Sequence, residues 1–535
     1  MKTFIKYLKT ALKAEHIKKR GTGIYVLSCI IGAISPIILY IARLQGSTRF
    51  IPRSVHNMYL NYIENSLELF AYYFLPFLII LVASRITFLD HKNSGWQLME
   101  TLPVQKYVNY FSKFIILLVS NGIAILTFAF LNFLFTFILS KTGAVPDLAT
   151  TDIPLYDILN IVLRLFIGSL FLSALQYVVS AVLSNFLWPI FVGIIGLAMN
   201  MFLNETGMFL SWYPYTGISA VFKYHHGSEV GNVLTYIDWL SLVGGIILLI
   251  IGYKWFKEKQ LSAFFKGKKS SVISMLASLV LLIGLFAFIQ KPKVFKTHSK
   301  TIISGTIESD KTIKKAYLFS PFIKDTLAIF PVENNKFQYE LKNDLKLGKY
   351  EINFDEAYNV KVFFGTNDSV NVQIKDDKIS VKGNRMVETS LGYPTTETLV
   401  DYWMEDPAML SNNYLFFTKF KKDWDEKVSN LDVYKTIDNF KPRADYIELQ
   451  KDLLFAQYHY YFNEYKTRVK AVYPDKKINI PDFMTMFESP IVHNEVFLDL
   501  NSYRYTVLTS LIAENKEDID ADTKSLLGLS KLKAS

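Results

Sequence analysis

Two charged residues interrupt otherwise apolar runs and are the first candidates for chemistry in this sequence. Arg164 lies about two turns inside one run, and Glu205 lies near the end of the next. Charges at membrane depth are costly, so they usually mark a pathway, a partner contact or a paired site. Two interpretations of Arg164 stay open: it faces a cavity or partner subunit, or it snorkels to the headgroups, because its run begins nearby at Asp157.

Established catalytic and metal-binding patterns are missing from the sequence. It has no Gly-x-x-x-x-Gly-Lys-Ser/Thr loop for ATP phosphates, no His-Glu-x-x-His and no Gly-x-Ser-x-Gly. His225 and His226 are adjacent, so they point apart, and no third ligand is evident. The run 518–522 has the opening spacing of a calcium loop, but Thr523 replaces the turn glycine and Leu529 the closing glutamate. We therefore expect no metal, no cofactor and no enzymatic activity of the chain's own.

A polar stretch, Asp90 to Tyr107, separates two long apolar runs. It cannot lie in lipid. Pro103 is expected to end a short helix there, because proline disfavours helical geometry in the residue before it. The functional hypothesis is a docking surface with Glu100 as a charge contact and Trp96 as an aromatic anchor. The alternative is an ordinary amphipathic loop at the membrane surface.

The order of residue types in this stretch resembles the loop between the second and third spans of ABC transporter permeases of the type-2 exporter class. The branch that exports lantibiotic and bacitracin-type peptides is the most similar. The shared features are acidic residues, a Gly-aromatic pair, a Leu-Pro pair and a following lysine: Asp90, Gly95, Trp96, Glu100, Leu102, Pro103 and Lys113. Lys106 is a further candidate residue of the same loop.

The resemblance covers about residues 1 to 258 and implies partners. The loop would be a coupling helix seated in a groove of a separate cytoplasmic ABC ATPase, present in two copies. The chain would work as a homodimer or as a heterodimer with a second permease. A seventh span and a large C-terminal region depart from the usual six-span plan of that class.

Composition also favours a protein that lives partly in a bilayer. The chain has 535 residues, 51% of them hydrophobic, and a mean hydropathy of +0.21. A crossing needs roughly 20 apolar residues, and such runs end near residue 290. The sequence predicts seven spans, at about 24–42, 67–88, 112–140, 158–184, 188–206, 237–256 and 272–290. The single cysteine, Cys29, excludes a disulfide framework within the chain.

Basic residues indicate the orientation of these spans. The net charge is +10, but lysines and arginines cluster beside the spans, so membrane orientation explains them better than nucleic acid does. The N-terminal segment and the loops 85–113 and 254–269 carry far more of them than the opposite flanks. We expect these three segments in the cytoplasm and, with seven spans, the C-terminal region outside the cell membrane.

The expected fold is therefore an α-helical polytopic membrane protein with a C-terminal extracytoplasmic β-sandwich and a helical region after it. The predicted parts are an amphipathic interfacial helix at 1–20, a six-span permease domain at 21–258, a cytoplasmic linker and seventh span at 259–292, a sandwich at 297–392 and a helical region at 393–535.

Eight short strands are predicted between residues 301 and 381, separated by turns such as Asn334-Asn335 and 365–368. They indicate a small antiparallel sandwich. The segments 304–307, 335–339, 348–352 and 367–370 resemble the sandwich that precedes the catalytic domain of membrane-anchored thiol:disulfide-reductase-like proteins. This resemblance implies an inner membrane, with the sandwich in a periplasm. Because no Cys-x-x-Cys occurs, disulfide exchange is not expected.

Two further features belong to the span region. The segment 204–236 between the fifth and sixth spans contains the aromatic run 212–217, and it is expected to form a re-entrant or interfacial turn anchored by these rings. Four polar residues inside spans are expected to hydrogen-bond between helices rather than to bind ligands: Asn121, Asn132, Gln176 and Asn200.

The favoured function is the membrane-spanning permease subunit of an ABC exporter, which couples ATP hydrolysis by another subunit to export of a hydrophobic or peptide-like substrate. The alternative is a membrane-anchored extracytoplasmic binding or sensor protein, whose spans are passive. A membrane-embedded enzyme ranks third, because no constellation of catalytic residues is present.

Overall fold

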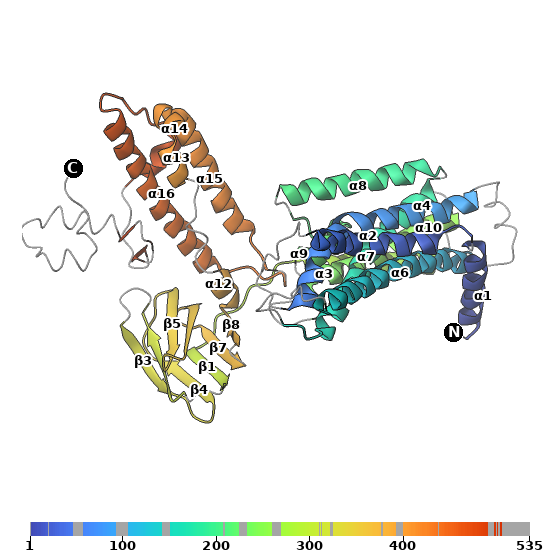
Figure 1. Cartoon of the computed structure of the whole chain (residues 1–535), viewed down its shortest axis with the longest axis horizontal. Coiled ribbons are helices and arrows are strands. Elements are labelled where there is room, and N and C mark those ends of the chain that lie inside the picture. The colour runs from blue at the N-terminus through green and yellow to red at the C-terminus, as the bar shows by residue number, and fades with distance from the viewer. Residues whose placement is uncertain are drawn as a thin grey trace, which may run out of the picture. The chain divides into compact units, whose positions relative to one another are not determined.

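The computed structural model describes residues 2–504 except 20, 46–56, 92–104, 142–149, 184, 207–208, 224–232, 259–268, 310, 312, 321–324, 376–377, 392–399, 437, 490–496, 499 and 501–502. The chain divides into two units (Figure 1). The first comprises Met1–Pro292 with the short segment Ile437–Asn439, and the second comprises Lys293–Thr436 and Phe440–Ser535.

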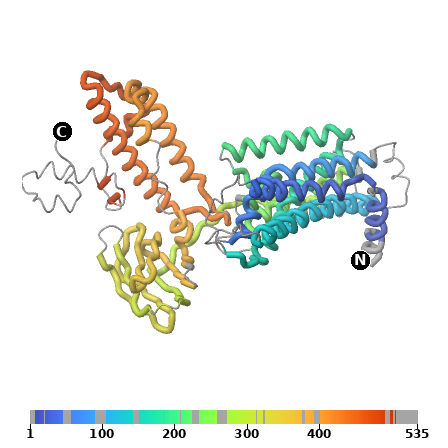
Figure 2. Tube along the Cα trace, viewed as in Figure 1, coloured from blue at the N-terminus to red at the C-terminus, as the bar shows by residue number. Residues whose placement is uncertain are grey.

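The first unit is a helix bundle in which most of the long helices run side by side, while the N-terminal helix lies across one end of them (Figures 1 and 2). Its described helices are α1 (Lys2–Lys19), α2 (Ile24–Leu44), α3 (Met58–Leu69), the π-helix η1 (Phe70–Phe74), α4 (Leu75–His91), α6 (Lys106–Lys141), α7 (Leu155–Val182), α8 (Leu187–Glu205), α9 (Thr216–Lys223), α10 (Tyr236–Glu258) and α11 (Lys269–Gln290). Within the described part of the chain, seven helical spans are long and apolar enough to cross a bilayer. This confirms a multi-pass helical membrane protein.

The second span is longer than predicted. Its predicted start lies near residue 67, whereas the span runs from Met58 to Leu89. Asn57 caps its first turn by accepting hydrogen bonds from the backbone of Tyr59 and Leu60. Polar residues in the first turns hid this start, since they lower the local hydropathy although the bundle buries them. The π-helical turn η1 comes just before Pro76, where a backbone donor is missing.

Helix α7 is the centre of the bundle. It packs against α4, α6, α8, α9 and α10, while α6 packs against α1, α2 and α3. The main apolar core is built from these helices. By contrast, α11 packs mainly against α10, and only 6% of the residues in its most apolar stretch are buried. In a membrane its remaining surface meets lipid or another chain.

The second unit begins with a two-layer sandwich of eight strands (Figure 1): β1 (Thr301–Glu308), β2 (Lys315–Phe319), β3 (Thr326–Pro331), β4 (Lys336–Leu341), β5 (Gly348–Phe354), β6 (Tyr358–Phe364), β7 (Ser369–Lys375) and β8 (Lys378–Gly383). One sheet has the order β4-β1-β7-β8 and the other β3-β2-β5-β6. Inward side chains alternate along the strands and form one apolar core. All eight predicted strands are confirmed.

The expectation of a purely antiparallel sandwich was wrong at one pairing. β1 and β7 are parallel, with Ile302 opposite Ser369 and Glu308 opposite Lys375. A parallel pair needs a long crossover, and here the five strands between β1 and β7 supply it. The turn signals were correct: Asn334 and Asn335 both have positive φ, of 49° and 60°, as a tight hairpin turn requires.

Helices follow the sandwich, as predicted. They are α12 (Met386–Leu391), α13 (Val400–Glu405), α14 (Pro407–Ser411), α15 (Asn413–Val433), α16 (Ala444–Val472) and the 3-10 helix η4 (Asp482–Glu488). Aromatic side chains of α15, α16 and η4 form their core. The rings of Phe416 and Tyr465 are stacked with centroids 3.6 Å apart. Phe363 of β6 contacts Tyr446 of α16, so sandwich and helices share a second apolar cluster.

Candidate functional site

The predicted coupling stretch lies mostly outside the described residues. This holds for Gly95, Trp96, Glu100, Leu102 and Pro103. Its two flanks are described. Asp90 belongs to the last turn of α4, and Lys106 is the first residue of α6, with an exposed side chain.

Lys106 connects this region to the end of α10. Its Nζ donates a 3.3 Å hydrogen bond to the carbonyl of Lys257. The end of α4, the start of α6 and the end of α10 therefore belong to one end of the bundle, because neighbouring spans alternate in direction.

The lysine that follows the stretch has a different place. Lys113, two turns into α6, is 1% exposed. On α1, which packs against α6, Glu15 is also buried. Lys113 therefore belongs to the bundle interior, whereas Lys106 lies at its surface. The paired histidines 225–226 and the acidic run 518–522 lie outside the described residues, and no cluster of metal-ligating side chains occurs in the described part of the chain.

Arg164 is buried between α7 and α10. Its Nε donates a 2.9 Å hydrogen bond to Oδ2 of Asp238, and both side chains have no exposed surface. This burial disagrees with the idea that Arg164 snorkels to the headgroups. In a low-dielectric interior the arginine requires a counter-charge, and Asp238 provides it.

Asp238 is held by the start of its own helix. Its Oδ2 accepts hydrogen bonds from the backbone N–H of Thr235 at 2.8 Å and from the Thr235 hydroxyl at 2.9 Å. In return the Thr235 hydroxyl accepts from the Asp238 N–H at 3.4 Å. This is a capping box, and an acidic side chain is favourable in the first turn of a helix. Asp238 was not among the predicted site residues, although the Thr-x-x-Asp spacing is a usable sequence signal.

Glu205 is not part of this pair. It is the last residue of α8 and its side chain is exposed. Within the described residues it forms no ion pair. The structure therefore separates the two intramembrane candidates.

Three of the four polar residues expected to hydrogen-bond between helices do so. Asn121 of α6 donates to Ser173 of α7 at 2.9 Å, and Asn132 accepts from Ser66 of α3 at 2.6 Å. Gln176 donates to the carbonyl of Pro189 in α8 at 2.7 Å. For Asn200, the amide nitrogen has no hydrogen-bond partner among the described residues.

The aromatic segment before α9 is anchored to α8. The hydroxyls of Tyr213 and Tyr215 each donate a 2.7 Å hydrogen bond, to the carbonyls of Gly196 and Gly193 respectively. A Cβ at either glycine would come within 2.7 Å of a neighbouring side-chain atom. The segment thus enters the apolar core of the bundle, where Tyr215 is 2% exposed.

Helix α9 also touches α7 at backbone distance. A Cβ added to Gly168 of α7 would lie 2.4 Å from the carbonyl oxygen of Gly217 in α9. Small residues allow such close approach between membrane helices. The short helix, the ion pair and the tyrosine anchors together join α7, α8, α9 and α10.

The sequence matches one known family model. Residues 11–200 match the model of the ABC-2 family transporter protein. The match runs from α1 into α8, covers less than half of the chain, and supports an ABC-2 type permease in this region. No curated protein and no solved structure matches the chain.

The second unit has a buried charged cluster of its own. Arg385, 2% exposed, donates to Asp368 at 2.8 Å and forms a bidentate pair with Asp445. Arg443 donates to Asp368 at 2.6 Å, and Glu388 lies 3.5 Å from Arg385. The cluster joins the β6–β7 turn, α12 and the start of α16. It holds the sandwich against the helical region.

Ionisation in this cluster follows from burial and charge. Burial raises the pKa of Glu388 above its ordinary value. Burial acts in the same direction on Asp445, but the hydrogen bond from Arg385 and the charges of both arginines outweigh it and lower the pKa of Asp445. Arg385 stays charged, because its hydrogen bonds to the carboxylates outweigh its desolvation and raise its pKa.

Proposed function

We propose that this chain is the membrane-spanning permease subunit of an ABC exporter. The observation that carries the proposal is the match of residues 11–200 to the ABC-2 family transporter protein. The seven apolar helices support it, as does the lack of an ATP-binding loop in the sequence. Energy for transport would come from a separate cytoplasmic ABC ATPase.

The polar stretch 92–104 is the proposed contact with that ATPase. Trp96 would be the aromatic anchor, Glu100 a charge contact, and Pro103 the fixed end of the coupling element. Movement of this stretch would reach the bundle through α4 and α6, the helices that flank it. The hydrogen bond between Lys106 and the Lys257 carbonyl would transmit part of the same movement to α10.

The buried ion pair gives a reason why this movement stays coordinated. α7 and α10 are linked by Arg164 and Asp238, and α7 is also in close contact with α9. Helices joined in this way move as one body, since separating two buried charges is costly.

We propose a hydrophobic or peptide-like substrate, a dimer of permease subunits, and an extracytoplasmic position for the second unit.

Co-purification tests the proposal. The tagged chain, extracted in mild detergent from its native membrane, should recover an ATPase subunit. Glu100→Lys should reduce this recovery about tenfold, because reversing a charge at an interface costs roughly one to several kcal/mol. Glu426→Lys, the same change at an exposed position of α15, should leave it unchanged. Equal recovery with both variants, or no ATPase with the unmodified chain, would contradict the proposal.

A further inference from the structure

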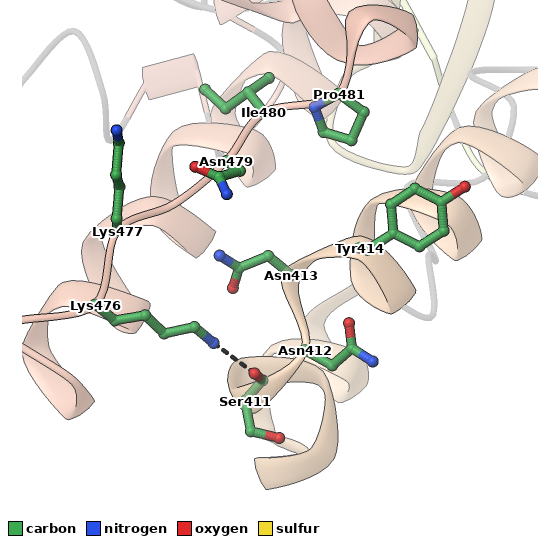
Figure 3. A pocket seen from close by; sticks show the side chains of 9 residues that line it. All are labelled: Ser411, Asn412, Asn413, Tyr414, Lys476, Lys477, Asn479, Ile480 and Pro481. Carbon is green, nitrogen blue, oxygen red and sulfur yellow. Dashed lines mark hydrogen bonds between the residues drawn. The ribbon is translucent and has the colours of Figure 1, made fainter.

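A polar cleft lies in the helical region of the second unit (Figure 3). It has a volume of about 660 Å³, within the range of ligand sites, roughly 300–1,000 Å³. One wall is the junction between α14 and α15, with Asn412, Asn413 and Tyr414. The other is the segment 476–481, which follows α16.

The chemistry of the cleft is one-sided. Among the described residues, its lining includes two lysines and three asparagines but no acidic residue. The Nζ of Lys476 reaches across to the carbonyls of Leu410 and Ser411, at 2.8 and 2.6 Å, and Figure 3 shows the second of these bonds. Asn413 accepts from the Tyr465 hydroxyl through Oδ1, so its amide N–H groups remain available to a ligand. Donors and positive charge therefore favour an occupant rich in carboxylates and carbonyls.

The backbone of the second wall is also available. Ile478 and Ile480 are half-buried and Lys477 and Asn479 exposed, which is the alternation of an extended strand. Among the described residues, the backbone groups of 477–480 form no hydrogen bond. An extended segment with free N–H and C=O groups is a template for the addition of another strand.

We propose that this cleft binds an extended acidic segment of another polypeptide. The segment pairs its backbone with residues 477–480, and its carboxylates meet Asn479, Asn413 and the two lysines. The Tyr414 ring, 66% exposed and edge-on to Phe483, offers a contact for an apolar group beside the acids. This site is independent of the proposed transport function.

The chain's own acidic run, 514–522, is the rival occupant, and deletion of the tail distinguishes it from a separate polypeptide.

Fluorescence anisotropy with the full chain in detergent tests the proposal. The probe is a short fluorescein-labelled peptide of alternating glutamate and threonine. Saturable binding is expected, about tenfold tighter than that of the same peptide with glutamine for glutamate, because the donors meet charged acceptors. Methylation of alternate backbone nitrogens of the probe should weaken binding similarly, because it removes the pairing donors.

Two matched variants localise the site. Asn479→Asp keeps the shape but adds a negative charge to the cleft, and it should weaken binding about tenfold. Asn430→Asp, the same change at an exposed position of α15, should have no effect. Equal binding of the acidic and amide probes, an equal effect of both variants, or insensitivity to methylation would each overturn the proposal. Binding that appears only after deletion of residues 505–535 would also overturn it, since the chain's own tail would then be the occupant.

Discussion

Arg164 on α7 and Asp238 on α10 form a hydrogen-bonded ion pair of 2.9 Å with no exposed surface on either side chain. Asp238→Leu should lower the unfolding free energy by about 3–5 kcal/mol, because it removes the carboxylate that pairs with the buried charge of Arg164. The double variant Arg164→Met with Asp238→Leu should regain most of that loss. Thermal unfolding in detergent measures both.

The comparison of single and double variants distinguishes pairing from packing. If the two substitutions contribute additively, the ion pair is not the source of the stability. Glu205→Gln serves as the control. The Glu205 side chain is exposed at the end of α8, so removal of its charge should change stability by less than about 0.5 kcal/mol.

The close approach of α7 and α9 should be sensitive to one methyl group. Gly168→Ala would place a Cβ 2.4 Å from the Gly217 carbonyl oxygen, and we expect a loss of about 1–3 kcal/mol. Gly284→Ala on α11 is the matched control, because its Cβ would meet nothing within 4 Å. Similar melting temperatures for the two variants would show that α9 is not held in this position.

Trp96 should matter for the ATPase and not for the fold of the chain. Trp96→Ala is expected to reduce recovery of the ATPase in co-purification by about tenfold or more, as removal of an aromatic anchor often costs 2 kcal/mol or more. Trp188→Ala removes another tryptophan, which is exposed on α8 at the same end of the bundle. It should keep full recovery. Loss of the ATPase with both variants would indicate a general effect on the bundle.

The charged cluster of the second unit should dominate its local stability. Arg385→Ala breaks contacts to Asp368, Asp445 and Glu388, and should reduce the opening free energy of β7 and α16 by about 3–5 kcal/mol. Lys300→Ala, which breaks an exposed pair with Glu340, should cost less than about 1 kcal/mol. Hydrogen exchange of the full chain, read by mass spectrometry, resolves both segments. Equal protection in the two variants would rule out the cluster as the main connection.

The same cluster predicts how stability depends on pH. The pKa of Asp445 is lower in the folded protein than its ordinary 3.8, so its contribution is present above pH 3.8 and is lost as the pH falls through the folded value. The raised pKa of Glu388 acts oppositely, since protonation just above its ordinary 4.5 relieves the cost of burial. Asp445→Asn should abolish the loss of stability at low pH. Hydrogen exchange of the cluster's segments, corrected for the pH dependence of intrinsic exchange rates, measures this. An unchanged acid profile would contradict this assignment.

Local patterns in the sequence predicted local structure well. Alternating side chains and turn residues located all eight strands, because these signals lie within each strand. The parallel pairing of β1 and β7 could not be predicted, since it depends on segments more than sixty residues apart. The cluster of Asp368, Arg385 and Asp445 was not predicted for the same reason, because its residues come from segments that are distant in the sequence. At the start of α3, buried polar residues such as Asn61 and Glu64 masked a span, because hydropathy does not record burial in a bundle.

The candidate sites were predicted less completely. Arg164 was identified because a lone charge in an apolar run is conspicuous, but its partner Asp238 lies at the edge of a span, where an acid is unremarkable. The cleft beside Asn479 had no sequence signal, because its donors come from two segments on either side of α16. The coupling stretch remains a prediction, since most of it lies outside the described residues.

The parallel pairing of β1 with β7 has a consequence for how the protein is made. During synthesis β1 leaves the ribosome long before β7. The edge of β1 that pairs with β7 therefore stays unpaired until the chain has been made as far as Lys375. Contacts between such distant segments form slowly, and unpaired strand edges invite association with other chains. The sandwich therefore folds only after nearly all of its sequence has been released, and a chain truncated before β7 would expose the edge of β1.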